Sequence, residues 1–146
     1  MACVLTKGRN VPCKSGVGGL KSVYFTDFGD LGAITIAGFE ITAIAGSPTL
    51  YQFDLKGNST FETTVTSSRE NGTTFYESTL TLNFTFQDRD TQEEIRLLAI
   101  ARPHIWVEAY SGLAGSSYYL MGKVNGCELT TGTFSNGAAM GDLNGY

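Results

Sequence analysis

The sequence predicts a mainly β protein, an antiparallel β-sandwich or half-barrel with one long hairpin and a single flanking helix. Apolar and polar residues alternate through much of residues 53–88, as they do on strands with one apolar and one polar face. Glycine occurs 18 times and proline only three times, which is typical of an all-β chain with many turns. The period becomes helical in one place, at about residues 90–101.

The chain has 146 residues, a length that suits one domain. Residues 1–20 are rich in glycine and lack periodicity, so we expect an extended N-terminal arm. Residues 21–146 are expected to form a single β-sandwich domain. Since a chain of this size commonly buries roughly 68–70% of its unfolded surface, we expect it to fold without disulfides or metals.

Short runs rich in β-branched and aromatic residues come first in the domain. Such runs favour strands because these side chains pack well on a pleated surface. We therefore expect four strands before the long hairpin, at residues 21–26, 33–36, 39–44 and 50–56.

The long hairpin is predicted from two alternating runs, residues 61–66 and 74–86, on either side of a polar turn. A usual strand has about 5–6 residues. The first run is as long as such a strand, and the second run is longer. Asn71 and Gly72 tolerate positive φ at both central positions of a type I′ turn, so we expect that turn between the strands.

The helix follows the hairpin. Asp90 is expected to cap it, with Glu93 completing a capping box, and Pro103 is expected to end it. Three further strands are predicted, at residues 104–110, 117–123 and 126–134. The last segment is loop-like and stops at Tyr146, where we expect another strand to begin and the natural chain to continue.

The formal net charge of −4 argues against a nucleic-acid-binding surface, which needs clustered Lys and Arg. We find no signal peptide and no apolar run long enough to span a membrane. Cys3, Cys13 and Cys127 lack the spacing of a zinc site. Two alternatives remain for these cysteines, a Cys3–Cys13 disulfide or thiols that stay reduced.

The sequence offers few catalytic groups. His104 is the only histidine, and its place at the start of an apolar strand favours a structural role over a general base. None of the common nucleophile, zinc-protease or phosphate-loop motifs is present in its required context. The sequence therefore predicts a protein that is not an enzyme and has no cofactor and no metal site.

Three segments carry a resemblance to a known family. They are residues 58–88 around the turn S-S-R-E-N-G-T-T-F-Y-E, the helix at 90–99, and the Gly/Ala-rich stretch 132–146. In this order the chain resembles the tail tube proteins of tailed bacteriophages, which share a fold with the tube subunits of contractile injection machines. The resemblance covers roughly residues 20–146 and depends on element order, since no diagnostic short motif is present.

The resemblance implies a structural virion protein of the tail, assembled in the cytoplasm of a bacterial host. In that family, subunits form hexameric rings whose sheets join into a continuous inner barrel, and rings stack through loops and the N-terminal arm. The implied partners are further copies of the chain and other tail or virion proteins. DNA would pass through the channel without being bound, and no membrane would be involved.

The polar face of the hairpin is where we expect the lumen of such a tube. Its candidate residues are Glu62, Thr64, Thr66, Glu77, Thr79, Thr81 and Asn83. The two glutamates would make the lumen acidic, so that it repels DNA phosphates and lets DNA slide. The opposite, apolar face is expected to pack against the helix.

Two other classes of function stay open. The first is another virion component with a related β-sandwich, such as a head–tail connector, a tail terminator or a capsid-decorating protein. The second is a β-sandwich module that binds carbohydrate or protein. A tube subunit should form rings or polymerise, a decoration protein should stay small, and a carbohydrate-binding module should expose coplanar aromatic side chains.

Overall fold

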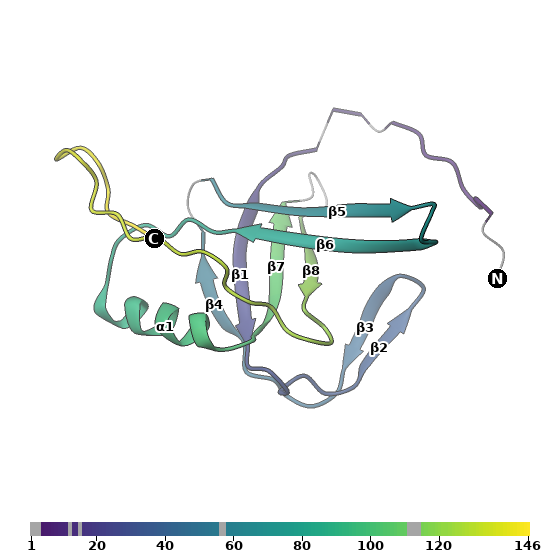
Figure 1. Cartoon of the computed structure of the whole chain (residues 1–146), viewed down its shortest axis with the longest axis horizontal. Helices are drawn as coiled ribbons and strands as arrows, with labels where there is room; N and C mark the ends of the chain where they lie inside the picture. The colour runs from purple at the N-terminus through teal and green to yellow at the C-terminus, as the bar shows by residue number, and fades with distance from the viewer. Residues whose placement is uncertain (1–3, 12, 15, 56–57, 111–114) are drawn as a thin grey trace.

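The computed structural model of the chain describes residues 4–11, 13–14, 16–55, 58–110 and 115–146. Figure 1 shows three antiparallel sheets and a single helix within this part of the chain. The elements are β1 (Leu20–Thr26), β2 (Ile34–Ala37), β3 (Glu40–Ile44), β4 (Tyr51–Asp54), β5 (Thr60–Ser68), β6 (Thr73–Thr81), α1 (Arg89–Ile100), β7 (His104–Tyr110) and β8 (Ser116–Met121). The predicted mainly β, antiparallel fold class is confirmed.

The core of the protein lies on one face of a four-stranded sheet with the order β4-β1-β7-β8. The register places Val23 opposite Val107, and both side chains are fully buried. The buried apolar residues are Val23, Phe25, Ile105, Val107 and Met121. Partly buried side chains complete the cluster, namely Leu20, Phe53, Leu55, Phe61, Leu80, Leu82, Phe84, Leu98 and Cys127. The second layer thus comes from the base of the long hairpin, the segment after it and α1.

Two ribbons project from this core, each made of two strands. β2 pairs with β3, and β5 pairs with β6 over nine residue pairs. In Figure 1, β5 and β6 cross the view of β1, β7 and β8 and extend beyond the sheet, whereas α1 lies at the opposite side of the molecule from their tip. The described residues of the N-terminal segment before β1 are exposed and form no strand or helix.

The helix begins one residue earlier than predicted, and its predicted cap is wrong. Asp88 is the N-cap residue, with extended φ and ψ, and Asp90 lies inside the first turn. Glu93 does not close a capping box; its carboxylate instead accepts two hydrogen bonds from Arg96. No residue of α1 is buried, and Leu98 is the helix side chain that packs against the core.

The second predicted strand of the long hairpin is too long, because β6 ends at Thr81. Beyond it, the chain pairs instead with the C-terminal segment: Phe84 and Tyr146 exchange backbone hydrogen bonds of 3.2 and 2.9 Å. Phe86 has a φ of 65°, and this left-handed residue redirects the chain toward α1. The last residues therefore pair only through isolated bridges, in which Gly145 is the partner of Thr85 and of Ser135.

The predicted strand at residues 126–134 is also wrong. Its first residues lie beside the chain just before β7, where the Cys127 N–H donates to the Pro103 carbonyl at 2.9 Å. Since strands exist through their partners, a run without a neighbouring strand stays irregular. The predicted strand at 50–56 shortens to β4, and its last residue, Lys56, lies outside the described residues.

The surface of the chain is much larger than that of a compact protein. The accessible surface is 11506 Å², whereas a compact monomer of this mass, 15.7 kDa, exposes roughly 7,300 Å². The same scaling gives an unfolded surface of roughly 22,800 Å², so the chain buries about half of it. The expected burial of about 68–70% is therefore not reached. The projecting ribbons and the exposed residues 4–11, 13–14 and 16–19 contribute to this difference.

Candidate functional site

The long hairpin brings most of the predicted lumen residues onto one face. Glu62 lies opposite Thr79, Thr64 opposite Glu77, and Thr60 opposite Thr81. Thr66 continues this face opposite Phe75, and all of these side chains are exposed. Glu62 and Glu77 are diagonal neighbours in this register, about 7–8 Å apart at their Cα atoms. The face is thus polar and acidic, with one aromatic residue near the tip.

Asn83 does not belong to this face. It lies beyond the end of β6, and its side-chain amide donates to the carbonyl of Asn58. Its backbone N–H donates to the hydroxyl of the buried Ser59 at 3.1 Å. Asn83 therefore closes the base of the hairpin, where the ladder of β5 and β6 stops.

The turn of the hairpin differs from the predicted type I′ turn. Ser68 pairs with Thr73, so four residues, 69–72, form the loop in place of two. Gly72 has a φ of 62°, but Asn71 does not share this left-handed conformation. The Asn71 N–H donates instead to the Ser68 hydroxyl at 3.3 Å, a local bond that stabilises the loop.

The apolar face of the hairpin is covered only at its base. Phe61 and Leu80 are opposite each other, partly buried, and packed against the core, and the Phe61 ring lies 5.7 Å from that of Tyr119. Farther along, Val65 is 56% exposed and Tyr76 is 70% exposed. The expectation that the helix covers this face is therefore wrong for the outer half of the hairpin.

Both outer edges of the hairpin are unpaired in the part of the chain that the structure describes. β5 and β6 form a sheet of two strands, with no third strand beside either of them. Hydroxyl pairs join the two strands to each other, such as Thr63 to Ser78 at 2.9 Å and Thr74 to Ser67 at 3.1 Å. A two-stranded ribbon with open edges is marginally stable alone and offers rows of backbone groups to another strand.

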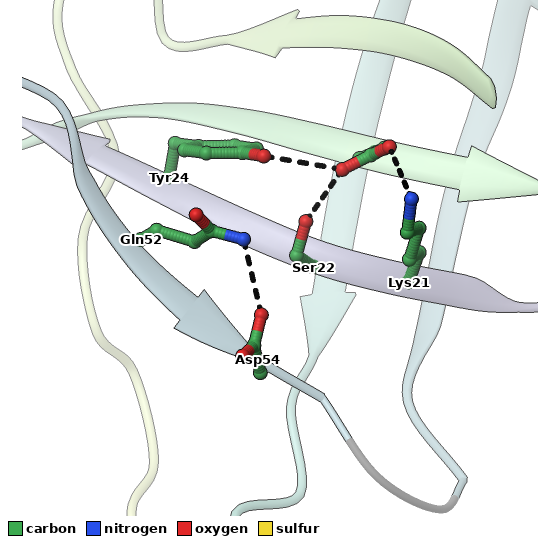
Figure 2. A network of polar contacts seen from close by, with 6 residues as sticks. Lys21, Ser22, Tyr24, Gln52 and Asp54 are labelled. Atoms are coloured by element: carbon green, nitrogen blue, oxygen red, sulfur yellow. Dashed lines mark hydrogen bonds and ion pairs between the residues drawn. The ribbon is translucent and has the colours of Figure 1, made fainter.

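A buried polar cluster lies on the other face of the central sheet, and no pattern in the sequence predicted it. Glu108 on β7 is 3% exposed and accepts hydrogen bonds from Ser22 at 2.6 Å and from Tyr24 at 3.2 Å. Lys21 forms an ion pair with the same carboxylate at 3.3 Å, as Figure 2 shows. A β-bulge between residues 20 and 22 directs the Lys21 side chain to this face.

The electrostatics of Glu108 indicate a structural role. The hydrogen bonds from Ser22 and Ser116 stabilise its charged form and lower the pKa of this carboxyl to about 2, against the opposing effect of burial. A carboxylate held this firmly in its ionised form is a poor proton carrier near neutral pH. The cluster ties β1, β7 and β8 together where the N-terminal segment enters the sheet.

His104 is placed as a structural histidine would be. It is 3% exposed, its Nδ1 lies 2.6 Å from the Gly122 carbonyl oxygen, and its ring stacks on Phe28 at 5.4 Å. Burial raises the pKa of the Cys127 thiol. Cys3 lies outside the described residues, so the alternatives of a Cys3–Cys13 disulfide and of reduced thiols both stay open.

Among the described residues, no three His, Cys, Asp or Glu side chains gather in a way that could hold a metal ion. In the same part of the chain, no helix is long and apolar enough to cross a membrane. Neither family models nor curated proteins nor solved structures gave a match to this chain.

Proposed function

We propose that this chain is a structural subunit of a bacteriophage tail tube, in which rings of copies stack around a channel for DNA. The observation that carries this proposal is the open state of the β5–β6 hairpin. Nine residue pairs join its strands. Among the described residues, however, no strand pairs with its edges, and its apolar face is covered only near Phe61 and Leu80. In the virion tail, neighbouring copies would supply what is missing.

Strand pairing between copies satisfies the backbone groups on the hairpin edges. An exposed, long strand edge invites association, and closure into a barrel removes such edges altogether. The apolar side chains left exposed, Val65 and Tyr76, would be buried in the same step. The excess of accessible surface over that of a compact monomer, about 4,200 Å², is in the range that large obligate interfaces bury.

The polar face would then line the channel. Glu62 and Glu77 lie on it together, and the threonines beside them are neutral. An acidic, hydroxyl-rich wall repels phosphates and offers DNA no cluster of cations to bind. Such a wall suits a conduit for DNA better than a site that holds it.

Electron microscopy of the purified protein tests this proposal. We expect rings of fixed subunit number or long tubes with a central channel. Thr79→Pro removes a backbone N–H from β6 and fixes its φ, so this variant should stay a soluble, folded monomer. Thr79→Ser keeps the N–H and should assemble like the wild type.

Tubes formed by Thr79→Pro would show that the hairpin does not mediate assembly. A wild-type protein that stays monomeric at every concentration would contradict the proposed function itself.

A further inference from the structure

The β2–β3 ribbon ends in an exposed aromatic side chain. Ala37 pairs with Glu40, which leaves Gly38 and Phe39 as a two-residue turn. Gly38 has a φ of 66°, which a type II′ turn requires at its first central position. Phe39 is 106% exposed, so its ring touches almost nothing in its own chain. Behind it, the paired residues Ile36 and Ile41 are also exposed.

A cavity of about 240 Å³ opens at the foot of the same ribbon. Its lining includes the apolar side chains of Phe28, Leu31, Ile34 and Val124, together with His104 and Lys123. An apolar cavity of about 150 Å³ is enough to hold benzene. The cavity is therefore large enough for a phenyl ring, beside the stacked rings of Phe28 and His104.

Phe39 cannot fill the cavity of its own chain. Ile34 lies at the cavity and Phe39 lies five residues farther along, which is about 16 Å on an extended strand. The pairing of Ile34 with Ile44 and of Ala37 with Glu40 holds the ribbon extended between these points. The Phe39 ring can therefore enter this cavity only in another copy of the chain.

The charges around the ring and the cavity are complementary. Glu40 follows Phe39 directly at the exposed tip. Lys123 lines the cavity, and the guanidinium of Arg102 lies 4.5 Å from the centre of the Phe28 ring. A tip that enters the cavity brings its carboxylate to these two cations, which favours this orientation of docking.

We infer that Phe39 of one copy inserts into the cavity of a second copy, with Glu40 beside Lys123. This inference rests on the proposed function, because it takes the partner to be another subunit of the same assembly. The tip and the cavity are different surfaces at opposite ends of the ribbon, so the contact is heterologous. The copy that inserts its tip keeps its cavity free, and the copy that receives it keeps its tip free, for further copies.

Two variants separate the two halves of this contact. Phe39→Ala removes the ring and leaves the cavity, whereas Val124→Trp fills the mouth of the cavity and leaves the ring. Val124 is 77% exposed, so neither change disturbs the core, and circular dichroism should show unchanged folding. Met140→Ala, at a residue 108% exposed in another loop, is the matched control.

The test is to purify the two variants separately, mix them in equal amounts and measure mass by sedimentation velocity. We expect each variant to associate at least tenfold more weakly than the wild type and Met140→Ala. Val124→Trp supplies only tips, and Phe39→Ala supplies only free cavities. Mixing the two variants should therefore double the mass of the species that each variant forms by itself.

Association of Phe39→Ala equal to that of the wild type, or no doubling on mixing, would overturn the inference. If the cavity binds a small phenyl compound but the protein does not self-associate, the occupant of the cavity is not a second copy of the chain. The proposed function is judged separately, by whether the wild-type protein forms rings or tubes in electron microscopy.

A charge exchange gives an independent check. Glu40→Lys and Lys123→Glu should each weaken association, and the double variant should recover most of it. If the double variant associates no better than the single variants, these two charges do not meet.

Discussion

The strand pair β1–β7 lies at the centre of the four-stranded sheet, whereas β5–β6 stands as a ribbon of two strands. Val23 and Val107 are opposite each other in the first pair and fully buried. Val65 and Tyr76 are opposite each other in the second pair and are 56% and 70% exposed. Both pairs have one apolar face, but the described part of the chain covers this face fully only in the first pair and covers it only at the base of the second.

This difference suggests where each pair obtains its stability. The central pair is held by side chains from several elements, including Phe53, Phe61 and Leu98. The hairpin is held by its own ladder, its hydroxyl pairs and contacts at its base. Substitutions in the first region should therefore change the free energy of unfolding, and substitutions in the second should change association.

The largest effect is expected for Phe25→Ala. Phe25 is 7% exposed and meets Phe53 edge to face, with ring centres 5.1 Å apart. Losing a buried phenyl ring costs about 3–5 kcal/mol in the free energy of unfolding. Urea denaturation at a concentration where the protein is monomeric measures this cost. A loss below about 1 kcal/mol would show that the core is not where stability resides.

A smaller effect is expected for Glu108→Gln, on the order of 2 kcal/mol near neutral pH, because buried donors lose a charged acceptor. The folded-state pKa of Glu108 is lowered to about 2, so its contribution is present above the ordinary carboxyl pKa and is lost as pH falls toward 2.

Unfolding free energies between neutral pH and pH 2 check this dependence. The slope between roughly pH 4.5 and pH 2 should be smaller in Glu108→Gln than in the wild type. Glu62→Gln, an exposed glutamate of the hairpin, is the control and should keep the wild-type slope. Equal slopes in all three proteins would contradict the role given to Glu108.

The smallest effect on unfolding is expected for Tyr76→Ala, which removes an aromatic side chain as Phe25→Ala does. Tyr76 is 70% exposed on the apolar face of the hairpin, so the free energy of unfolding of the monomer should change by less than about 0.5 kcal/mol. The concentration needed for half-maximal assembly should nevertheless rise about tenfold, since exposed aromatics commonly anchor interfaces. A large loss of monomer stability would place Tyr76 in a folded core.

The sequence predicted most local structure and missed most of what depends on partners. The strand at 104–110 was predicted with its observed bounds because its apolar run lies between Pro103 and a Gly- and Ser-rich stretch of sequence. The alternation also placed Glu62, Glu77 and Thr79 on one face correctly. Alternation predicts on which face of a strand each side chain lies. It does not predict whether another element covers that face.

The errors occur where a tertiary contact overrides the local pattern. Residues 82–86 continue the alternation of β6, but the pairing of Phe84 with Tyr146 redirects the chain. Residues 126–134 have no strand beside them in the part of the chain that the structure describes. The Glu108 cluster could not be predicted, because its partners Ser22 and Tyr24 lie more than 80 positions away in the sequence.

Hydrogen exchange of the backbone amides tests the central claim most directly, with the monomer and the concentrated protein compared. We expect the amides of β1 and β7 to be protected in both samples, because their ladder is complete within one chain. The amides of β5 and β6 should exchange quickly in the monomer and at least tenfold more slowly in the assembly. Equal exchange of the hairpin amides in both samples would contradict the claim that other copies complete this hairpin.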